Sequence, residues 1–221
     1  MNVLLAVLGK DLLIEWRSRD RLVAMSVFAV LVVLILYFAA PPGQGAAGRA
    51  HVPGLLWVAY VFATVLGLGR SFALELENEA LSGLALAPAD RGWIFLGKAL
   101  ANVLIVMAVQ LLTAFAFALA FDLDLWPIAP ALAGVSVLGA VGLCSLGTLF
   151  SAMAVRTSNR EVMLPLLMLP LMIPVLLGAV RATQGLFLDG SLPDSALQLL
   201  LVTDGVFLIV SFLGFEYVLD D

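Results

Sequence analysis

Long apolar runs recur along the chain at a length that suits helices crossing a lipid bilayer. A helix needs about 17 to 25 mostly apolar residues to span the hydrocarbon core. Six runs meet this requirement, at residues 22–40, 52–69, 99–121, 130–155, 162–180 and 195–215. The strands of a membrane barrel would instead be short and would alternate in polarity. The pattern therefore predicts an all-α, polytopic membrane protein, with residues 1–221 forming a single domain of six transmembrane helices.

The residues before the first span carry a helical pattern of their own. Over residues 1–21, Leu5, Leu8, Leu12 and Trp16 recur at helical spacing, and basic residues occupy another face. We expect an amphipathic helix that lies along the membrane surface; a plain cytoplasmic extension of the first span is the alternative. Its apolar run is too short for the h-region of a cleavable signal peptide, so the helix should be retained.

Composition narrows the picture further. Hydrophobic residues make up 63% of the chain and charged residues 12%, whereas apolar residues make up about half of a soluble domain. The spans leave too little polar sequence for a sizeable domain outside the bilayer. The formal net charge is −5, but the acidic residues are scattered along the chain. Charge therefore indicates no particular partner, and we expect no binding of nucleic acid.

Basic residues are distributed unevenly between the two sides of a six-span topology. Lysine and arginine near the spans are held on the cytoplasmic side during insertion. Those on one side are Lys10, Arg17, Arg19, Arg21, Arg70, Arg91, Lys98, Arg156 and Arg160. Arg49 and Arg181 fall on the other side. Both termini are therefore expected in the cytoplasm, and the tyrosines and tryptophans expected at the two interfaces agree with this orientation.

The fourth apolar run carries small residues on one helical face. They recur at every fourth position, as Ser136, Ala140, Cys144, Thr148 and Ala152. Gly139, Gly142 and Gly147 flank them. Small side chains let helix backbones approach closely in lipid, so the pattern predicts a packing face. Whether that face packs within the chain or against a second copy stays open.

The fifth run is interrupted by Pro165, Pro170 and Pro174. Each proline lacks a backbone N–H donor, so we expect this helix to be kinked at Pro170 and Pro174 or partly unwound. A bent helix suits a moving part of a transporter, and it suits a static membrane helix equally well.

Catalytic and metal-binding patterns are sparse. Catalysis by a membrane protease needs a nucleophile beside a base, but the single histidine, His51, falls in a predicted outer loop. His51 could ligate iron or haem from that side, although a lone surface histidine is ordinarily just solvated. Cys144 is the single cysteine and sits mid-helix as a small apolar side chain. No cluster has metal-ligand spacing, so we expect a non-catalytic chain that binds neither a metal nor a cofactor itself.

Residues 92–98 spell the first seven positions of a P-loop, from Gly92 through Gly97 to Lys98. A P-loop follows a strand, exposes its backbone and ends in a Ser or Thr that binds magnesium. Here bulky apolar residues fill the interior, Ala99 follows the lysine, and the segment opens a predicted membrane helix. We expect no nucleotide site, so any ATP would be hydrolysed by another chain.

Asp204 lies inside the sixth apolar run. An ionised carboxylate at the centre of a membrane helix costs about 2.5 to 3.5 kcal/mol on insertion scales. Asp204 should then face protein or water and is a candidate for a substrate or proton pathway. The alternative is that the helix is shifted and Asp204 sits near the outer interface.

The sizeable polar stretch at residues 70–98 is expected in the cytoplasm. Its acidic part holds Glu75, Glu77 and Glu79, and Leu81, Gly83 and Leu84 follow before Pro88 ends the segment. As a helix it would present an apolar face that the loop is too small to cover, which calls for a partner surface. A helix that lies on the membrane is the alternative.

Taken in order, these features resemble the permease subunits of ABC exporters of the ABC-2 type, and most closely the haem exporter protein B (CcmB) family of cytochrome c maturation. The likeness covers nearly the whole chain. The matching segments are residues 10–11, 17–21, 52–58, 70–72, 75–79, 84–88, 96–98 and 169–174. One departure is that residues 79–84 replace the Gly-Ser/Thr-Leu-Glu stretch common in such permeases.

The resemblance implies a half-transporter of the bacterial inner membrane in which residues 70–98 act as the coupling segment. Two copies of the chain would join two ABC ATPase subunits, a haem-handling membrane subunit and a small membrane subunit. ATP would bind the ATPase, and its hydrolysis would support export of haem or release of a haem-loaded periplasmic chaperone. A proton-coupled secondary transporter that uses Asp204 is the alternative, and a passive membrane scaffold is a third possibility.

Overall fold

The computed structural model describes residues 3–39, 45–72, 90–154 and 160–220. Within these ranges the chain is helical and contains no strand. The elements are α1 (Val3–Ser18), α2 (Asp20–Ala39), α3 (Gly45–Leu68), α6 (Arg91–Phe121), the short 3₁₀ helix η1 (Trp126–Ile128), α7 (Ala129–Ala154), α8 (Arg160–Leu188) and α9 (Asp194–Asp220). The predicted all-α fold is confirmed.

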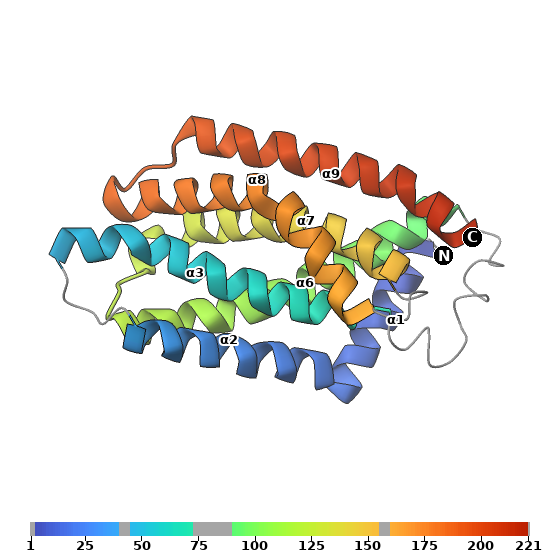
Figure 1. The fold of residues 1–221 in the computed structure, drawn as a ribbon, viewed down its shortest axis with the longest axis horizontal. Helices are drawn as coiled ribbons and strands as arrows, with labels where there is room; N and C mark the ends of the chain where they lie inside the picture. Colours follow the sequence, from blue (N-terminus) through green and yellow to red (C-terminus); the bar gives the residue numbers. More distant parts are fainter. Residues whose placement is uncertain (1–2, 40–44, 73–89, 155–159, 221) are drawn as a thin grey trace.

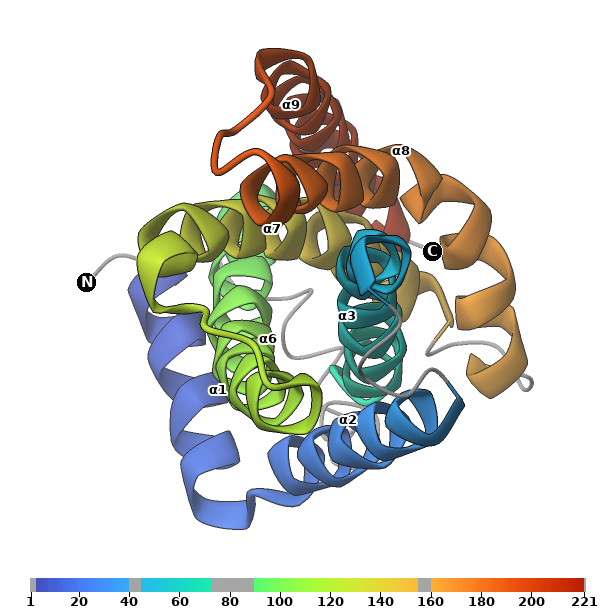
Figure 2. The same ribbon diagram turned by 90° about the vertical axis from the view of Figure 1, so that its left-hand side faces the viewer.

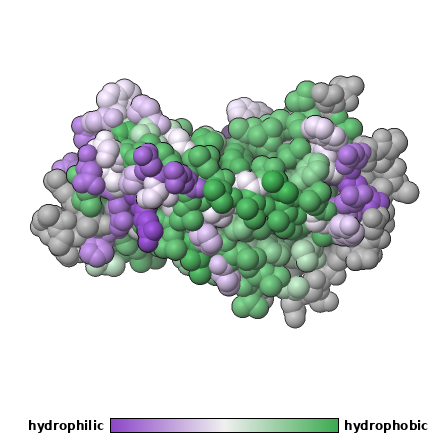
Figure 3. All heavy atoms as spheres, turned by 90° about the horizontal axis from the view of Figure 1, so that it is seen from above, coloured by the Kyte–Doolittle hydropathy of each residue, from purple (hydrophilic) through white to green (hydrophobic). Residues whose placement is uncertain are grey.

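Six of these helices, α2, α3, α6, α7, α8 and α9, are long and apolar enough to cross a bilayer, which confirms the predicted number of spans. They run side by side, and α1 lies at the same end of the bundle as the end of α9 (Figure 1). We call this the terminal end. On the face that Figure 3 shows, apolar residues cover the middle of the molecule and hydrophilic residues gather toward the two ends. A bilayer suits this banded surface.

Three helices extend well beyond the predicted spans, and helix α3 begins at Gly45 rather than at residue 52. Helix α6 begins at Arg91 rather than at residue 99, because Asp90 caps it by accepting a hydrogen bond from the Gly92 N–H at 2.9 Å. Residues 91–98, which the sequence placed in the cytoplasmic loop, are therefore the first turns of a membrane helix. Helix α8 continues to Leu188 rather than ending at residue 180.

The bend expected in α8 is present, but the helix is not unwound. Pro165, Pro170 and Pro174 all lie inside one continuous helix. Figure 2 shows that α8 curves strongly in the half that carries these prolines. A proline removes one backbone hydrogen bond and crowds the preceding turn, which accounts for a bend without a break.

Helix α7 is the centre of the packing, with α3, α6, α8 and α9 all against it. Each of its predicted small residues, Ser136, Ala140, Cys144, Thr148 and Ala152, is buried inside this single chain. Its glycines mark close crossings. A Cβ atom at Gly139 would lie 2.3 Å from Trp57 of α3, and one at Gly147 would lie 2.1 Å from Leu68 of the same helix. The small-residue ridge therefore serves packing within the chain.

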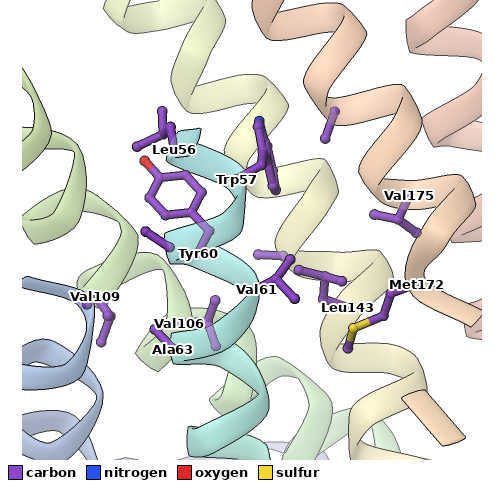
Figure 4. Packing of buried hydrophobic residues seen from close by; sticks show 14 of the residues in the cluster. Leu56, Trp57, Tyr60, Val61, Ala63, Val106, Val109, Leu143, Met172 and Val175 are labelled. Atoms are coloured by element: carbon purple, nitrogen blue, oxygen red, sulfur yellow. The ribbon is translucent and has the colours of Figure 1, made fainter. Parts of the chain in front are cut away.

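Helix α3 fills the space between α6 and the pair formed by α7 and α8. Figure 4 shows Tyr60 and Ala63 on the side toward α6, and Trp57 and Val61 on the side toward α7 and α8. The Trp57 indole N–H donates to Thr183 Oγ1 at 2.9 Å, so a buried polar bond links α3 to α8. This part of the core lies away from the terminal end.

Candidate coupling site at the terminal end

Residues 73–89 lie outside the described part of the chain. The predicted coupling residues Glu75, Glu77, Glu79, Leu81, Gly83, Leu84 and Pro88 therefore lie outside it as well. Both flanks of this segment are described, however. Ser71 and Phe72 follow α3, and Asp90 caps α6. How these flanks are held determines how residues 73–89 are attached to the membrane domain.

The first flank is held by an aromatic cluster. Phe72 is buried and packs 6.4 Å, between ring centroids, from Phe215 of α9, which in turn lies 5.5 Å from Phe95 of α6. Arg91, on the first turn of α6, donates to the backbone carbonyl of Glu216 at 3.2 Å. The two flanks of residues 73–89 thus pack against the same stretch of α9.

Helix α1 crosses the beginning of α6 at very short range. A Cβ atom at Gly97 would lie 2.8 Å from the Leu4 carbonyl oxygen and 2.9 Å from Val7 Cβ. Only glycine leaves room for the α1 backbone at that point. The predicted apolar face of α1 is divided in the structure, because Leu5 and Trp16 are exposed while Leu12 packs partly against the core.

A buried ion pair joins the same two helices. Lys98 is 1% exposed, and its Nζ lies 2.9 Å from Asp11 Oδ2 of α1. The Lys98 ammonium also donates to the Ser71 carbonyl at 3.1 Å and lies 4.4 Å from the centroid of the Phe72 ring. Asp11 is partly exposed and lies 3.1 Å from Lys10 as well. Lys98 therefore contacts α1 and the residues that lead into segment 73–89 at once.

Next to this pair, the Asn102 side chain connects four segments. Its amide nitrogen donates to Ser71 Oγ and to Thr148 Oγ1 of α7, each at 2.9 Å, and its oxygen accepts from Arg21 Nη1 at 2.9 Å. Arg21, at the start of α2, also donates from Nε to Glu15 of α1 at 3.1 Å. A buried amide with all these partners satisfied fixes the arrangement of the helices that supply them.

We call this group the anchor cluster. Its members are Asp11, Glu15, Arg21, Ser71, Lys98, Asn102 and Thr148. They come from α1, α2, the turn that follows α3, α6 and α7. Removing one partner of a buried ion pair costs about 3–5 kcal/mol, because the other charge is left uncompensated. The cluster therefore holds firmly only when it is complete.

The anchor cluster gives the P-loop-like sequence a packing role. A Cβ atom at Gly92 would lie 2.3 Å from the Phe212 ring of α9, Gly97 admits α1, and Lys98 pairs with Asp11. Sequence reasoning did not connect Lys98 with Asp11. The available signal was one lysine and one aspartate of opposite charge, each next to an apolar stretch, that the six-span topology brings to the same side of the membrane.

Asp204 is held inside the bundle rather than at its end. It is 5% exposed and lies ten residues into α9, about 15 Å along the helix at 1.5 Å per residue. A Cβ atom at Gly142 of α7 would lie 2.2 Å from Asp204 Oδ1, so the absent side chain makes room for the carboxyl group. Neither carboxyl oxygen has a hydrogen-bond partner among the described residues. A buried carboxyl without a partner is costly unless it binds a proton.

The remaining candidates gather no further site. His51 is exposed on α3, and Cys144 is buried within α7. Across the described ranges, no group of three or more His, Cys, Asp or Glu side chains is placed to hold a metal ion.

The fold defines an all-α, multi-pass membrane protein in which an N-terminal helix packs against the start of the third span, α6. The family model described as CcmB protein matches residues 2–216. The chain therefore belongs to the CcmB family, which confirms the resemblance seen in the sequence.

Curated relatives match the sequence of this chain over most of their length. Heme exporter protein B of Paracoccus denitrificans is 33% identical over 179 residues, which cover 81% of each chain. Its counterpart in Rhodobacter capsulatus is 33% identical over 185 residues, covering 81% of this chain and 82% of the relative. Heme exporter protein B of Pseudomonas aeruginosa is 31% identical over 195 residues and 86% of both chains.

Proposed function

We propose that this chain is the permease subunit of an ABC transporter for cytochrome c maturation in the bacterial inner membrane. Two copies would join two ATPase subunits, a haem-handling membrane subunit and a small membrane subunit. Hydrolysis of ATP in the partner chain would drive export of haem or release of a haem-loaded periplasmic chaperone. The observation that carries this proposal is the match to the CcmB family along residues 2–216, together with relatives named heme exporter protein B.

In this proposal the terminal end faces the cytoplasm and residues 73–89 dock on the ATPase. The basic residues of the described part support that orientation, because Lys10, Arg17, Arg21 and Lys98 all belong to the terminal end. The anchored flanks support the docking role. Force applied to segment 73–89 would pass directly to α3, α6 and α9 through Phe72, the anchor cluster and the Asp90 cap.

Retention of the ATPase tests the proposal. Leu84→Asp places a carboxylate in the predicted apolar contact, where burial of a leucine contributes about 1.5–3 kcal/mol. We expect the variant to insert and accumulate normally but to lose the ATPase on affinity purification, with more than a tenfold fall in retained partner, since about 1.4 kcal/mol is tenfold in affinity. Cytochrome c maturation should fall with it.

Leu188→Asp is the matched control. Leu188 is exposed at the end of α8 that lies opposite the terminal end, so the same chemical change there should leave the ATPase bound. Purification of both Leu81→Asp and Leu84→Asp with a normal amount of ATPase would move the docking role to another segment, first of all the stretch around residues 156–161.

A second candidate function, a proton-coupled secondary transporter, is favoured by the buried and unpartnered carboxyl group of Asp204. A membrane-embedded acid of this kind can carry a proton along a transport pathway. Asp204→Asn keeps the shape but cannot release a proton. We expect the variant to be expressed and assembled with reduced maturation of c-type cytochromes. Normal maturation would assign Asp204 a packing role only, and an ATP-independent, proton-driven flux without an ATPase partner would favour this second function.

A further inference from the structure

Helix α1 is attached to the flanks of segment 73–89 more extensively than to the span that follows it. Its Asp11 carboxylate holds Lys98, which also binds the Ser71 carbonyl beside residue 73. Val3 and Val7 pack against the apolar cluster that contains Phe72 and Phe95. The chain between α1 and α2, by contrast, is a tight corner at Arg19, whose φ is 59°. A left-handed backbone at an arginine makes this corner a sharp change of direction and separates the two helices.

Burial makes the Asp11–Lys98 pair asymmetric. Lys98 is 1% exposed, while the Asp11 side chain is 13% exposed and lies 3.1 Å from Lys10 as well. Loss of the lysine would leave an aspartate that water and Lys10 still stabilise. Loss of the aspartate charge would take away the carboxylate that lies 2.9 Å from a deeply buried ammonium group. The two halves of the pair should therefore respond differently to substitution.

From these contacts we propose that α1 is a working part of the coupling apparatus, with Asp11 and Lys98 as the positioning residues that clamp α1 to both flanks of segment 73–89. The inference rests on the proposed docking of that segment to an ATPase. With the clamp closed, α1, the start of α6 and the end of α3 move as one body, so a displacement of residues 73–89 reaches the spans. With the clamp open, the ATPase still docks and still displaces residues 73–89. The flanks then shift relative to α1, and the spans do not follow the displacement.

The test is to open the clamp without touching segment 73–89. In Asp11→Asn we expect ATPase retention and ATP hydrolysis by the purified complex within about twofold of the unsubstituted protein, but cytochrome c maturation lowered about tenfold or more. Lys98→Met removes both contacts of the clamp and should lower maturation as well, but with a smaller loss of folded protein, because Asp11 keeps water and Lys10. Asp11→Glu retains the charge on a longer side chain in a partly exposed position, and it should restore maturation.

Thr183→Val is the matched structural control. It removes the buried Trp57–Thr183 hydrogen bond of the α3–α8 core and leaves the terminal end untouched. We expect a lower level of folded protein but normal maturation per molecule. Normal maturation in Asp11→Asn would overturn the clamp. Loss of the ATPase from that variant would also overturn it, because the cluster would then serve docking itself. Failure of Leu84→Asp to release the ATPase would instead overturn the docking proposal, and with it the clamp that rests on it, so the two failures are told apart by which variant behaves unexpectedly.

A cross-link covers the case in which Asp11→Asn does not accumulate. In a Cys144→Ala background, Asp11→Cys with Lys98→Cys removes both charges and places two thiols across the α1–α6 contact. Spheroplasts carrying this protein should mature little cytochrome c until a short bifunctional thiol reagent joins the two positions, and joining them should restore maturation. If the cross-linked protein stays inactive while the same reagent leaves the Cys144→Ala parent active, α1 must leave α6 during the cycle and the rigid clamp is wrong.

Discussion

At the scale of single residues, glycine and aspartate form a complementary pair inside the bundle. Gly142 of α7 leaves the space that the Asp204 carboxyl group of α9 fills. The sequence singled out Asp204 as a side chain that should face protein or water, because an acidic residue within an apolar run is rare. Its depth could not be predicted, since the apolar run alone does not fix where α9 begins, and Gly142 lies 62 positions earlier in the chain.

Substitution of Gly142 tests this fit. A Cβ atom there would lie 2.2 Å from Asp204 Oδ1 and 2.9 Å from Val175 Cγ2, so Gly142→Ala should destabilise the folded protein by about 1–3 kcal/mol through overpacking. Thermal unfolding of the detergent-purified protein measures the loss. Gly134→Ala, on the same helix with open space around position 134, should be neutral or slightly stabilising. Equal unfolding temperatures for the two variants would contradict the close fit.

At the scale of elements, the apolar runs predicted the central part of each spanning helix well, but they predicted poorly the residues at which the helices begin and end. The start of α6 was missed because Arg91 and Lys98 have the composition of a loop. Each finds its partner only in the fold, in the Glu216 carbonyl and in Asp11. Asp11 and Lys98 are 87 positions apart, so no local pattern joins them. The small-residue ridge of α7 could be recognised in the sequence. Which helices pack against it could be learned only from the three-dimensional structure.

The crossing of α1 over α6 gives a prediction for these elements. Gly97→Ala places a Cβ atom 2.8 Å from the Leu4 carbonyl oxygen, which belongs to the α1 backbone and cannot rotate away. We expect a loss of about 1–3 kcal/mol in stability, together with faster proteolysis of α1 in the purified protein. Gly9→Ala, on α1 itself with nothing within 4 Å, supplies the comparison. Equal protease resistance in the two variants would show that α1 does not depend on this crossing.

At the scale of the whole molecule, an even number of spans brings the two ends of the chain to one side of the membrane, as the bundle in Figure 1 shows for α1 and α9. The predicted side follows from the basic residues, which are concentrated at the terminal end. The side itself cannot be read from packing, because a bundle has the same internal contacts in either orientation.

Reporter fusions test the orientation. A reporter of cytoplasmic location placed within residues 73–89 should be active, and one placed at Gly190, between α8 and α9 at the opposite end, should be inactive. A periplasmic reporter should give the reverse pattern at both positions. Periplasmic activity at residues 73–89 would place the terminal end outside and would remove the docking proposal with it.

The anchor cluster can be completed only late in synthesis, because its members are far apart in the sequence. Asp11 and Glu15 leave the ribosome early, but Lys98 and Asn102 emerge only after two spans have been synthesised, and Thr148 only near the end of α7. During that interval α1 has no helix to pack against except the start of α2. Leu5, Leu13 and Trp16, which stay exposed even in the finished fold, give α1 an apolar surface by which lipid can hold it in place. A nascent chain released before α6 is complete should therefore keep α1 on the membrane surface with Asp11 still lacking its Lys98 partner.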